Sequence, residues 1–563
     1  MRWTLKPKPA PQKIADFAKE LGVDLAISEL LIQRGIDTFQ AAKTFFRPSW
    51  SDLHDPFLMK DMNAAVTRIQ SAIENKEQIL IYGDYDVDGT SSVALMASYL
   101  DTKSTKVSTY IPDRYDEGYG VSYKGIDYAS DNNFSLIIAL DCGVKAIEKV
   151  SYAKSKGIDF IICDHHRPGN ELPLAVAVLD PKRSDCNYPF KELCGCGVGF
   201  KLIQALAYMD NKPAESLLGY LDLVATAIGA DIVPIVGENR ALAYLGLQVI
   251  NSKPRPGFMA IISQIKKETL TMTDVVFNIA PRINAAGRMM HGNYAVELMK
   301  ETDLKNAKSA AIEIENFNTS RREADKLITK EALEQIENAN ETNHATTVVY
   351  QDNWHKGVIG IVASRLIETY YRPTLVFTKS GDYLAASARS VRGFDVYNAL
   401  EKCSHLIEQF GGHMYAAGLT IKQENYLPFK SAFEAEVSKT LPTQLKTPEI
   451  TIDSEINFES ITPKFFRILK QFAPFGPQNL SPVFMTSKVN DTGYGKCVGE
   501  DQTHLRLTLT QNRSTKIVAI GFGLAARLPI VKSKKNFKAV YSIDENQWNG
   551  RVNLQLKLKD LKL

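Results

Sequence analysis

The sequence predicts an α/β protein in which a long helix joins two α/β lobes and a C-terminal β-barrel follows them. Three observations support this prediction. Short apolar strands alternate with helical segments between about residues 60 and 235. Residues 303 to 340 are polar, with apolar positions at helical spacing. From about residue 448 onward, short strands separated by turns replace this pattern, as is typical of a β-barrel.

The length of 563 residues is too great for a single core. We expect a helical N-terminal segment at 1–55, a catalytic α/β domain at 56–300, a connecting helix at 301–342, a second α/β domain at 343–445 and a β domain at 446–563. The net charge of +3 means that nucleic-acid binding would depend on local basic patches.

The chain shows no sign of export. Its start, MRWTLKPKPAPQ, has no apolar signal-peptide region, and no run of 18 apolar residues predicts a membrane span. The seven cysteines form no paired framework, which predicts a cytoplasmic location. A zinc site made of Cys186, Cys194 and Cys196 is an alternative, but their spacing matches no standard site.

The stretch 78–92, QILIYGDYDVDGTSS, carries the strongest chemical signal. An apolar strand ends at Gly83, and Asp84, Asp86 and Asp88 follow at alternate positions before a helix that Thr90 or Ser91 would cap. Three neighbouring carboxylates repel one another, and a divalent cation would relieve this repulsion. A solvated acidic turn and a calcium loop are the alternatives. The calcium-loop spacing fails at its twelfth position, which is not Glu.

Other predicted strands also end in ionisable residues. The strand before residue 141 leads into Asp141, the strand before residue 164 leads into Asp164-His165-His166, and a third leads into Asp180. A single such Asp could cap a helix, and Asp180 before Pro181 is typical of a plain turn. Several in register predict one acidic rim of a parallel sheet. Asp231, which follows a nearly all-apolar helical stretch, needs either an arginine or this metal cluster as a partner.

In this order, DYDVDG, ALDCG, DHH and GADIVP resemble the four motifs of the DHH phosphoesterase superfamily. Downstream, PRINAAGRM, WHKGVIGIVASRL, ASARS and FGGHMYAAG resemble the RecJ family of bacterial single-strand-specific 5′→3′ DNA exonucleases. The resemblance covers almost the whole chain. It implies that the two lobes are DHH and DHHA1 domains and that the C-terminal barrel is an OB-like nucleic-acid-binding domain.

The resemblance also implies two divalent metal ions, with Mn2+ preferred or Mg2+, because oxygen donors and one imidazole suit these ions. The implied metal ligands are Asp84, Asp86, Asp88, Asp141, His165 and Asp231, with Asp141 as the best bridging ligand. The implied catalytic residues around the metals are His166, Asp164, Arg282 and His413. His166 would either support a ligand or contact the scissile phosphate.

Five further residues are implied to bind substrate. Arg114, Ser387 and Arg389 are expected to hold the 5′ phosphate, although Arg114 could equally form a loop salt bridge. The other two implied substrate-binding residues are Arg365 and Arg288. Arg288 belongs to the PRINAAGRM motif, which could instead be a helix-packing seam. At the basic C-terminal end, Phe475, Tyr494 and Trp548 could stack on bases, or the domain could simply be solvated and basic.

The chain is therefore expected to be a metal-dependent exonuclease that degrades single-stranded DNA 5′→3′ to 5′-mononucleotides in repair and recombination. Its expected partners are single-stranded DNA, a single-strand-binding protein and a RecQ-type helicase, and we expect a monomer. The alternatives are a small DHH phosphodiesterase acting on oligoribonucleotides or cyclic dinucleotides, an inorganic pyrophosphatase relative, and a catalytically inactive scaffold that binds single strands.

Overall fold

The computed structural model describes residues 1–103, 106–512, 515–548 and 551–563. The predicted role of Trp548 as a stacking ring depends on a side chain outside this description. The chain forms two compact units, one of residues 1–2, 285–291 and 312–449, and the other of residues 3–284, 292–311 and 450–563. None of the helices in the described ranges combines the length and apolarity needed to cross a lipid bilayer.

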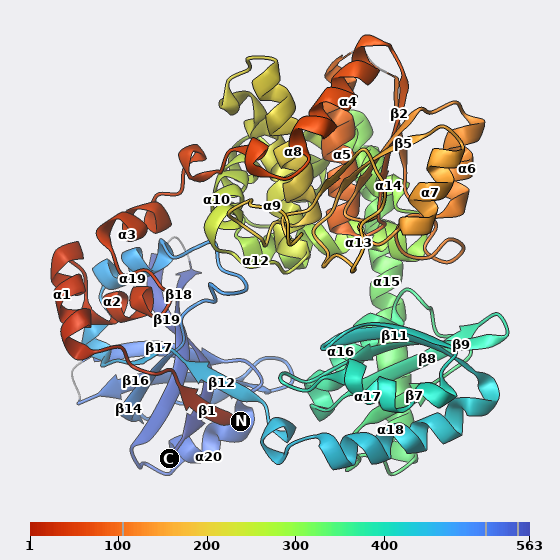
Figure 1. Cartoon of the computed structure of the whole chain (residues 1–563). Helices are drawn as coiled ribbons and strands as arrows, with labels where there is room; N and C mark the ends of the chain where they lie inside the picture. The colour runs from red at the N-terminus through yellow and green to blue at the C-terminus, as the bar shows by residue number, and fades with distance from the viewer. Residues whose placement is uncertain (104–105, 513–514, 549–550) are drawn as a thin grey trace. The chain divides into compact units, whose positions relative to one another are not determined.

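The first α/β domain is built on a five-stranded parallel sheet with the order β3-β2-β4-β5-β6 (Figure 1). The order reverses between β2 and β4, and open α/β sheets bind ligands at the carboxyl ends of the strands beside such a switch point. The predicted alternation of strands and helices is confirmed, and the strands are β2 (Gln78–Gly83), β3 (Lys106–Tyr110), β4 (Leu136–Leu140), β5 (Asp159–Cys163) and β6 (Ala177–Leu179).

Helices cover both faces of this sheet. Side chains such as Tyr82, Ile137 and Phe160 form a core with α6 (Tyr123–Asp131) and α7 (Ile147–Ser155). On the other face, α5 and α8 contact the central strands. Further helices complete the region: α4 (Met62–Glu74), α5 (Val87–Leu100), α8 (Gly195–Met209), α9 (Leu221–Ala230), α10 (Gly237–Ser252), α11 (Pro256–Ile262), α12 (Met272–Asp274), the π-helical turn η5 (Val275–Ile279), α13 (Ala280–Met289) and α14 (Asn293–Lys300).

The predicted start of α5 was wrong. The helix begins at Val87 instead of near Thr90 or Ser91, because the Asp86 side chain caps it by accepting a hydrogen bond from the Gly89 amide at 3.0 Å. Asp88 therefore lies in the first helical turn instead of in a loop.

The second α/β domain has a five-stranded sheet with the order β10-β11-β9-β8-β7, and only β7 and β8 run parallel. The long predicted helix is confirmed as α15 (Leu304–Asn338), whose Ile328, Ala332 and Ile336 pack in one core with Val362 and Leu366. The other elements are β7 (Thr347–Tyr350), α16 (Ile359–Tyr370), β8 (Thr374–Ser380), β9 (Tyr383–Arg389), α17 (Val396–Lys402), β10 (Gln409–His413), β11 (Ala416–Lys422) and α18 (Tyr426–Thr440).

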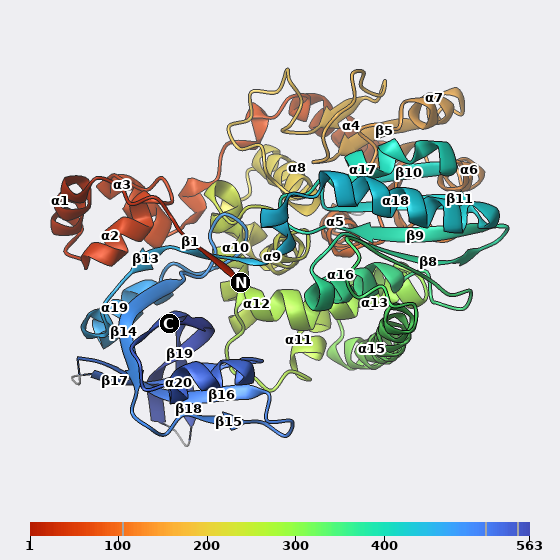
Figure 2. The ribbon, with the colours of Figure 1, turned by 90° about the horizontal axis from the view of Figure 1, so that it is seen from below.

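The predicted C-terminal barrel is confirmed (Figure 2). Strands β14, β18, β19, β17 and β16 pair in this order, and a β14–β16 pairing closes the barrel. Its elements are β12 (Glu449–Ile452), β13 (Ser454–Glu455), α19 (Pro463–Lys470), β14 (Phe484–Asp491), β15 (Lys496–Val498), β16 (His504–Gln511), β17 (Thr515–Gly521), α20 (Leu528–Lys532), β18 (Phe537–Trp548) and β19 (Arg551–Lys562).

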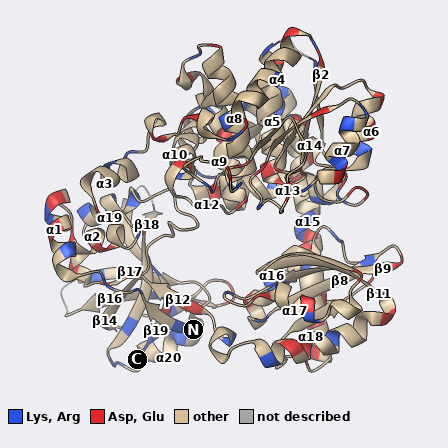
Figure 3. Ribbon diagram, viewed as in Figure 1, with Lys and Arg blue, Asp and Glu red and all other residues tan. Residues whose placement is uncertain are grey.

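Charges of both signs are spread over the ribbon (Figure 3), in agreement with the near-neutral net charge. Some of the barrel's lysines are already paired, since Lys470 contacts Glu545 at 2.8 Å and Lys557 contacts Asp544. Tyr494 is 82% exposed, whereas Phe475 packs partly buried against the barrel core. Of the proposed base-stacking rings with described side chains, Tyr494 is therefore the accessible one.

The N-terminal segment contains the predicted helices α1 (Pro11–Leu21), α2 (Leu25–Ile32) and α3 (Phe39–Phe46). It also contains a strand that the sequence did not predict, β1 (Arg2–Leu5), which pairs with β12. Phe17 and Leu30 are buried in the same core as the barrel residues Phe465 and Phe484. The first helices of the chain and its last domain therefore share one hydrophobic core.

Candidate metal centre

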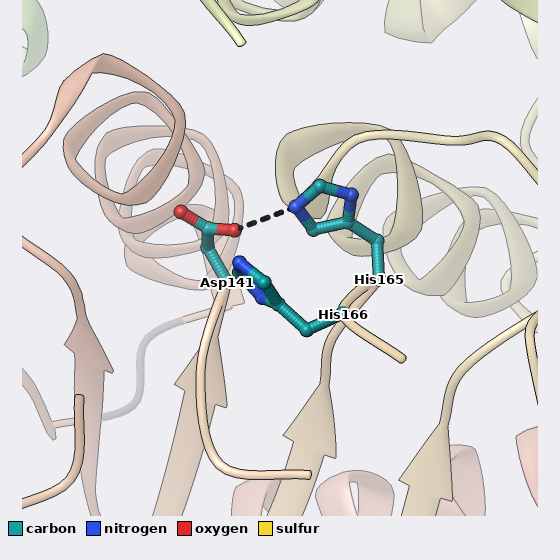
Figure 4. A group of neighbouring side chains, drawn as sticks. All are labelled: Asp141, His165 and His166. Carbon is teal, nitrogen blue, oxygen red and sulfur yellow. Dashed lines mark ion pairs between the residues drawn. The ribbon is translucent and has the colours of Figure 1, made fainter. Parts of the chain in front are cut away.

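Four ionisable side chains converge at the carboxyl ends of the parallel strands. His165 Nε2 lies 3.2 Å from Asp141 Oδ1, 3.6 Å from Asp231 Oδ2 and 3.8 Å from Asp88 Oδ2. Figure 4 shows Asp141 and His165 pointing toward each other, with the ring of His166 beside them. Ligand atoms of Asp88, His165 and Asp231 lie within 4.8 Å of one another, as do those of Asp141, His165 and His166. These spacings suit metal coordination.

Backbone geometry holds two of these carboxylates in place. Asp88 accepts hydrogen bonds from the amides of Gly195, at 2.6 Å, and Cys196, at 2.8 Å, at the positive N-terminal end of α8. Asp141 has a left-handed backbone with φ of 60°. A Cβ on Gly195 would lie 2.5 Å from the Asp141 Cβ, so only glycine allows α8 to approach so closely.

Three of the carboxylates have a buried oxygen that accepts no hydrogen bond from the described part of the chain. Within the described residues, Asp84 Oδ2, Asp141 Oδ1 and Asp231 Oδ2 have no hydrogen-bond donor. Burial, and then the charge of neighbouring carboxylates, raises the pKa of Asp84 to about 8, of Asp88 to about 6 and of Asp231 to about 8, and holds that of Asp141 well above its usual range. A divalent cation is the group that such a donor set fits.

The two histidines differ in charge. Burial, followed by the charge of His166, lowers the pKa of His165 to about 3, so its ring is neutral and suited to bind a metal. His166 Nδ1 lies 2.8 Å from Asp164 Oδ1, and its Nε2 lies 3.1 Å from the Tyr119 hydroxyl. Burial opposes the His166 cation, but the hydrogen bond and charge of Asp164 outweigh it and raise the pKa of His166 to about 9.

The Asp164 carboxylate, in contrast, accepts several hydrogen bonds. Burial disfavours its charge, but hydrogen bonds from His166 and from the Val144 amide bring its pKa to about 2. The Asp164 carboxylate therefore orients the ring of His166.

Three further predicted or discounted acids lie around the cluster. Asp86 uses one oxygen to cap α5, and Asp84 Oδ1 lies 3.5 Å from the Gly120 amide. The interpretation of Asp180 as a plain turn residue was incomplete. It accepts a hydrogen bond from the Lys182 amide at 2.7 Å but is fully buried, and its Oδ2 has no donor among the described residues.

The arginine and zinc alternatives find no support here. The Asp231 carboxylate approaches His165, and no ion pair with an arginine is seen within the described residues. The cysteines act as caps and packing groups: Cys194 Sγ accepts from the Gly197 amide at 3.3 Å, and Cys186 Sγ accepts from the Lys60 amide at 3.5 Å. No cysteine joins a metal-binding group in the described part of the chain.

Two of the predicted arginines belong to the metal-bearing unit. The Arg114 guanidinium lies over the Tyr85 ring at 4.6 Å, and its charge lowers the pKa of Asp84 against the larger effect of burial. Arg282 donates to the Asn278 carbonyl at 2.5 Å.

The remaining predicted site residues belong to the other unit. Arg389 Nη1 donates to Ser387 Oγ at 3.0 Å. A Cβ on Gly360, in the first turn of α16, would lie 2.9 Å from Ser387 Oγ and 3.0 Å from Arg389 Nη2. The absence of a side chain at Gly360 thus brings a helix N-terminus against a serine and an arginine, an arrangement that can bind phosphate.

Three residues of that unit lie elsewhere in it. Arg365 Nε contacts both oxygens of the buried Asp325, at 2.7 and 2.9 Å, which anchors α16 to α15. Arg288 donates to the Gly357 carbonyl at 2.9 Å. His413 is exposed at the end of β10.

Sequence reasoning missed Gly195 and Tyr119. The run GCGVG at the start of a helical stretch indicates that the helix packs closely against another segment. Nothing in the run shows that this segment contains Asp141. Tyr119 lies in a loop whose position beside His166 no periodicity encodes.

Three family profiles match the chain: the N-terminal domain of the DHH family at residues 78–228, the DHHA1 domain at 342–439 and the RecJ OB domain at 452–560. The fold and the acidic cluster together define a phosphoesterase of the DHH class.

Curated proteins that align with most or all of this chain identify the family within this class. The single-stranded-DNA-specific exonuclease RecJ of Bacillus subtilis is 35% identical over 100% of this chain and 70% of its own length. The protein of the same name from Haemophilus influenzae is 31% identical over 89% of this chain and 90% of its own length. The chain belongs to the RecJ family.

Solved structures agree. Thermus thermophilus RecJ in complex with Mn2+ shares the fold, with a TM-score of 0.86 at 24% identity over 100% of this chain and 79% of that one. A structure of exonuclease RecJ bound to manganese matches 69% of this chain and 98% of that one, at 28% identity and a TM-score of 0.61.

Proposed function

We propose that this protein is a metal-dependent exonuclease that hydrolyses single-stranded DNA 5′→3′ and releases 5′-mononucleotides. The observation that carries the proposal is the convergence of Asp88, Asp141, Asp231 and His165 on one point at the carboxyl ends of the catalytic sheet. The relatives' names, which specify single-stranded DNA and exonuclease action, support the substrate and the reaction.

In this proposal Asp84, Asp86, Asp88, Asp141, His165 and Asp231 hold two divalent ions, Mn2+ or Mg2+. The manganese in the related exonuclease structure supports this assignment. When bound, such ions would supply positive charge for the scissile phosphate and acidify water to yield a nucleophile. The neutral ring of His165 leaves a nitrogen lone pair for coordination, and Asp141 has an oxygen free to bridge.

The chain's own residues orient the substrate. His166, whose ring Asp164 orients and keeps protonated, is proposed to contact the phosphate that undergoes attack, where an imidazolium can stabilise the developing negative charge. Arg114 and Arg282 of the same unit, and Arg288, Arg365 and His413 of the other, are proposed as further substrate contacts.

Ser387 and Arg389 are proposed to hold the terminal 5′ phosphate at the N-terminus of α16. Removing the guanidinium in Arg389→Ala should abolish any preference for 5′-phosphorylated over 5′-hydroxyl strands, measured by kcat/KM on the two substrates. An unchanged preference would contradict this assignment.

Finer features of the proposal depend on resemblance. We propose a cytoplasmic monomer that acts on strands opened by a RecQ-type helicase and covered by single-strand-binding protein. The seven cysteines, all free thiols, suit a reducing compartment.

The test is digestion of one oligonucleotide labelled at either end, single-stranded or in a duplex, with Mn2+ or with EDTA. We expect labelled mononucleotide to appear first from the 5′ label, on the single strand only and with metal only. Mononucleotide appearing first from the 3′ label would reverse the polarity. Hydrolysis of a cyclic dinucleotide, but not of a long strand, would instead support the small-phosphodiesterase alternative.

A further inference from the structure

Two exposed apolar side chains lie near the end of α9: Ile232 follows Asp231 directly, and Phe277 belongs to a segment that packs against α9. Ile232 is 70% exposed and has a φ of 60°, a left-handed conformation that a β-branched residue rarely adopts. Phe277 is 72% exposed and lies in the π-helical turn η5. Single-turn π-helices are rare and recur at functional sites.

Packing holds η5 against the end of α9. A Cβ on Gly229 would lie 2.6 Å from Met272 Sδ and 3.3 Å from Val276 Cγ2, so glycine lets this segment approach two residues before Asp231. Val275 and Ile279 are fully buried and anchor the turn from the inside. Phe277, between these anchors, is turned outward.

The turn is also tied to the arginine motif that follows it. Arg282 donates to the Asn278 carbonyl at 2.5 Å, which fixes the residue next to Phe277. An aromatic ring is thus presented to solvent by a turn that is held on both sides and that packs against α9 two residues before the candidate metal ligand Asp231.

We propose that Phe277 stacks on a nucleobase of the single strand next to the metal centre, with Ile232 as a second apolar contact. This inference rests on the proposed function and names a positioning residue for it. A phenyl ring has no hydrogen-bonding group, so it accepts all four bases, as an exonuclease without sequence preference requires. Stacking there holds the nucleotide so that its phosphate stays at the ligands.

The experiment combines Phe277→Ala with abasic sites in the substrate. Phe39, 55% exposed on α3, provides the matched control Phe39→Ala. We expect Phe277→Ala to raise KM for a single-stranded oligonucleotide about 5- to 100-fold, on the scale of one base–aromatic stack, and Phe39→Ala to leave it unchanged. Hydrolysis of an oligonucleotide in which every nucleotide is abasic should proceed at the same rate in the wild type and both variants, because this substrate has no ring to stack.

An abasic site moved along the strand locates the contact. At one position, loss of the base should slow the wild type but cost Phe277→Ala nothing more, since the stacking partner is already missing. Equal abasic penalties in both proteins at every position would overturn the inference, as would an unchanged KM. A wild-type protein that fails to degrade the intact strand with Mn2+ would instead refute the proposed function.

Discussion

Buried acids in the metal-bearing unit fall into two groups that differ in how their charge is balanced. Glu238 is fully buried but receives the Lys201 ammonium at 3.0 Å, the Tyr188 hydroxyl at 2.7 Å and the His54 amide at 2.9 Å. Asp222, equally buried, contacts Arg255 at 2.9 Å. Among the described residues, no lysine or arginine forms an ion pair with Asp88, Asp141 or Asp231, and the ring that approaches all three, that of His165, is neutral.

This difference separates the acids that are buried to stabilise the fold from the acids that are buried to bind a ligand. An unpaired buried carboxylate costs several kcal/mol, and this fold supplies cations where it buries an acid for structure. At the strand ends it gathers Asp88, Asp141 and Asp231 instead, and burial first, then the charge of neighbouring carboxylates, raises the pKa of each. Such crowding persists in a folded protein when an external cation relieves it, so the comparison itself points to the metal.

The largest expected effect comes from Asp141→Ala. Removal of the proposed bridging carboxylate should lower kcat by at least about a thousandfold, since a bound metal contributes several kcal/mol to the transition state. Folding should be unimpaired, because the change also removes a repelling charge. Nuclease assays in Mn2+ buffer, with circular dichroism as the control for folding, test both statements. A wild-type rate would exclude the role assigned to Asp141.

The structural group should respond in the opposite way. Glu238→Gln leaves the fully buried Lys201 without its anion, so the free energy of unfolding should fall by about 3–5 kcal/mol. The rate per folded molecule should not change. Denaturant unfolding and active-site titration separate the two quantities. A loss of rate without a loss of stability would show that Glu238 serves the reaction and not the fold, which would contradict its place among the structural acids.

The sequence predicted most of what builds this site. Alternation of apolar strands with helices predicted the parallel sheet, and each strand end at residues 84, 141 and 164 predicted an acidic rim, because parallel strands bring their carboxyl ends to one edge. Asp231 joined the cluster from a helix end, as its isolation among apolar residues suggested.

Other features depend on contacts that no periodicity records. The strand β1 is four residues long and forms because β12, almost 450 positions later, offers it an edge. The early start of α5 depends on one cap by Asp86, which competes with Thr90 and Ser91 for the same role. Gly195 matters because of Asp141, a neighbour 54 positions away that only the fold brings near.

Gly195→Ala tests whether the position of the Asp141 carboxylate matters for the rate. Its Cβ would lie 2.5 Å from the Asp141 Cβ, so the carboxylate must move. A displacement of about 1 Å in an active site costs on the order of a hundredfold in rate. Gly219→Ala, where a Cβ meets nothing within 4 Å, is the control and should be neutral. Equal activity of the two variants would show that Asp141 tolerates displacement.

The last and smallest effect concerns pH. The folded pKa values of Asp84 and Asp231, about 8, and of Asp88, about 6, exceed the unfolded value near 3.9. Together with Asp141, these carboxyls bind more protons in the metal-free folded protein than in the unfolded chain between about pH 4 and pH 8, and they outnumber His165, whose low pKa acts in the opposite direction. By linkage, the stability of the metal-free protein should fall as pH rises through this window, by on the order of 1 kcal/mol per pH unit.

Saturating Mn2+ should remove this fall, because the ion takes the place of the protons and favours the ionised carboxylates. Thermal unfolding in EDTA and in Mn2+ at pH 5, 6, 7 and 8 measures both slopes, and Asp141→Asn should flatten the EDTA slope by removing one repelling charge. The Lys201–Glu238 pair is present in every sample, so it cannot account for a slope that metal abolishes. Parallel slopes in the two buffers would mean that the strand-end acids are balanced from within the protein after all.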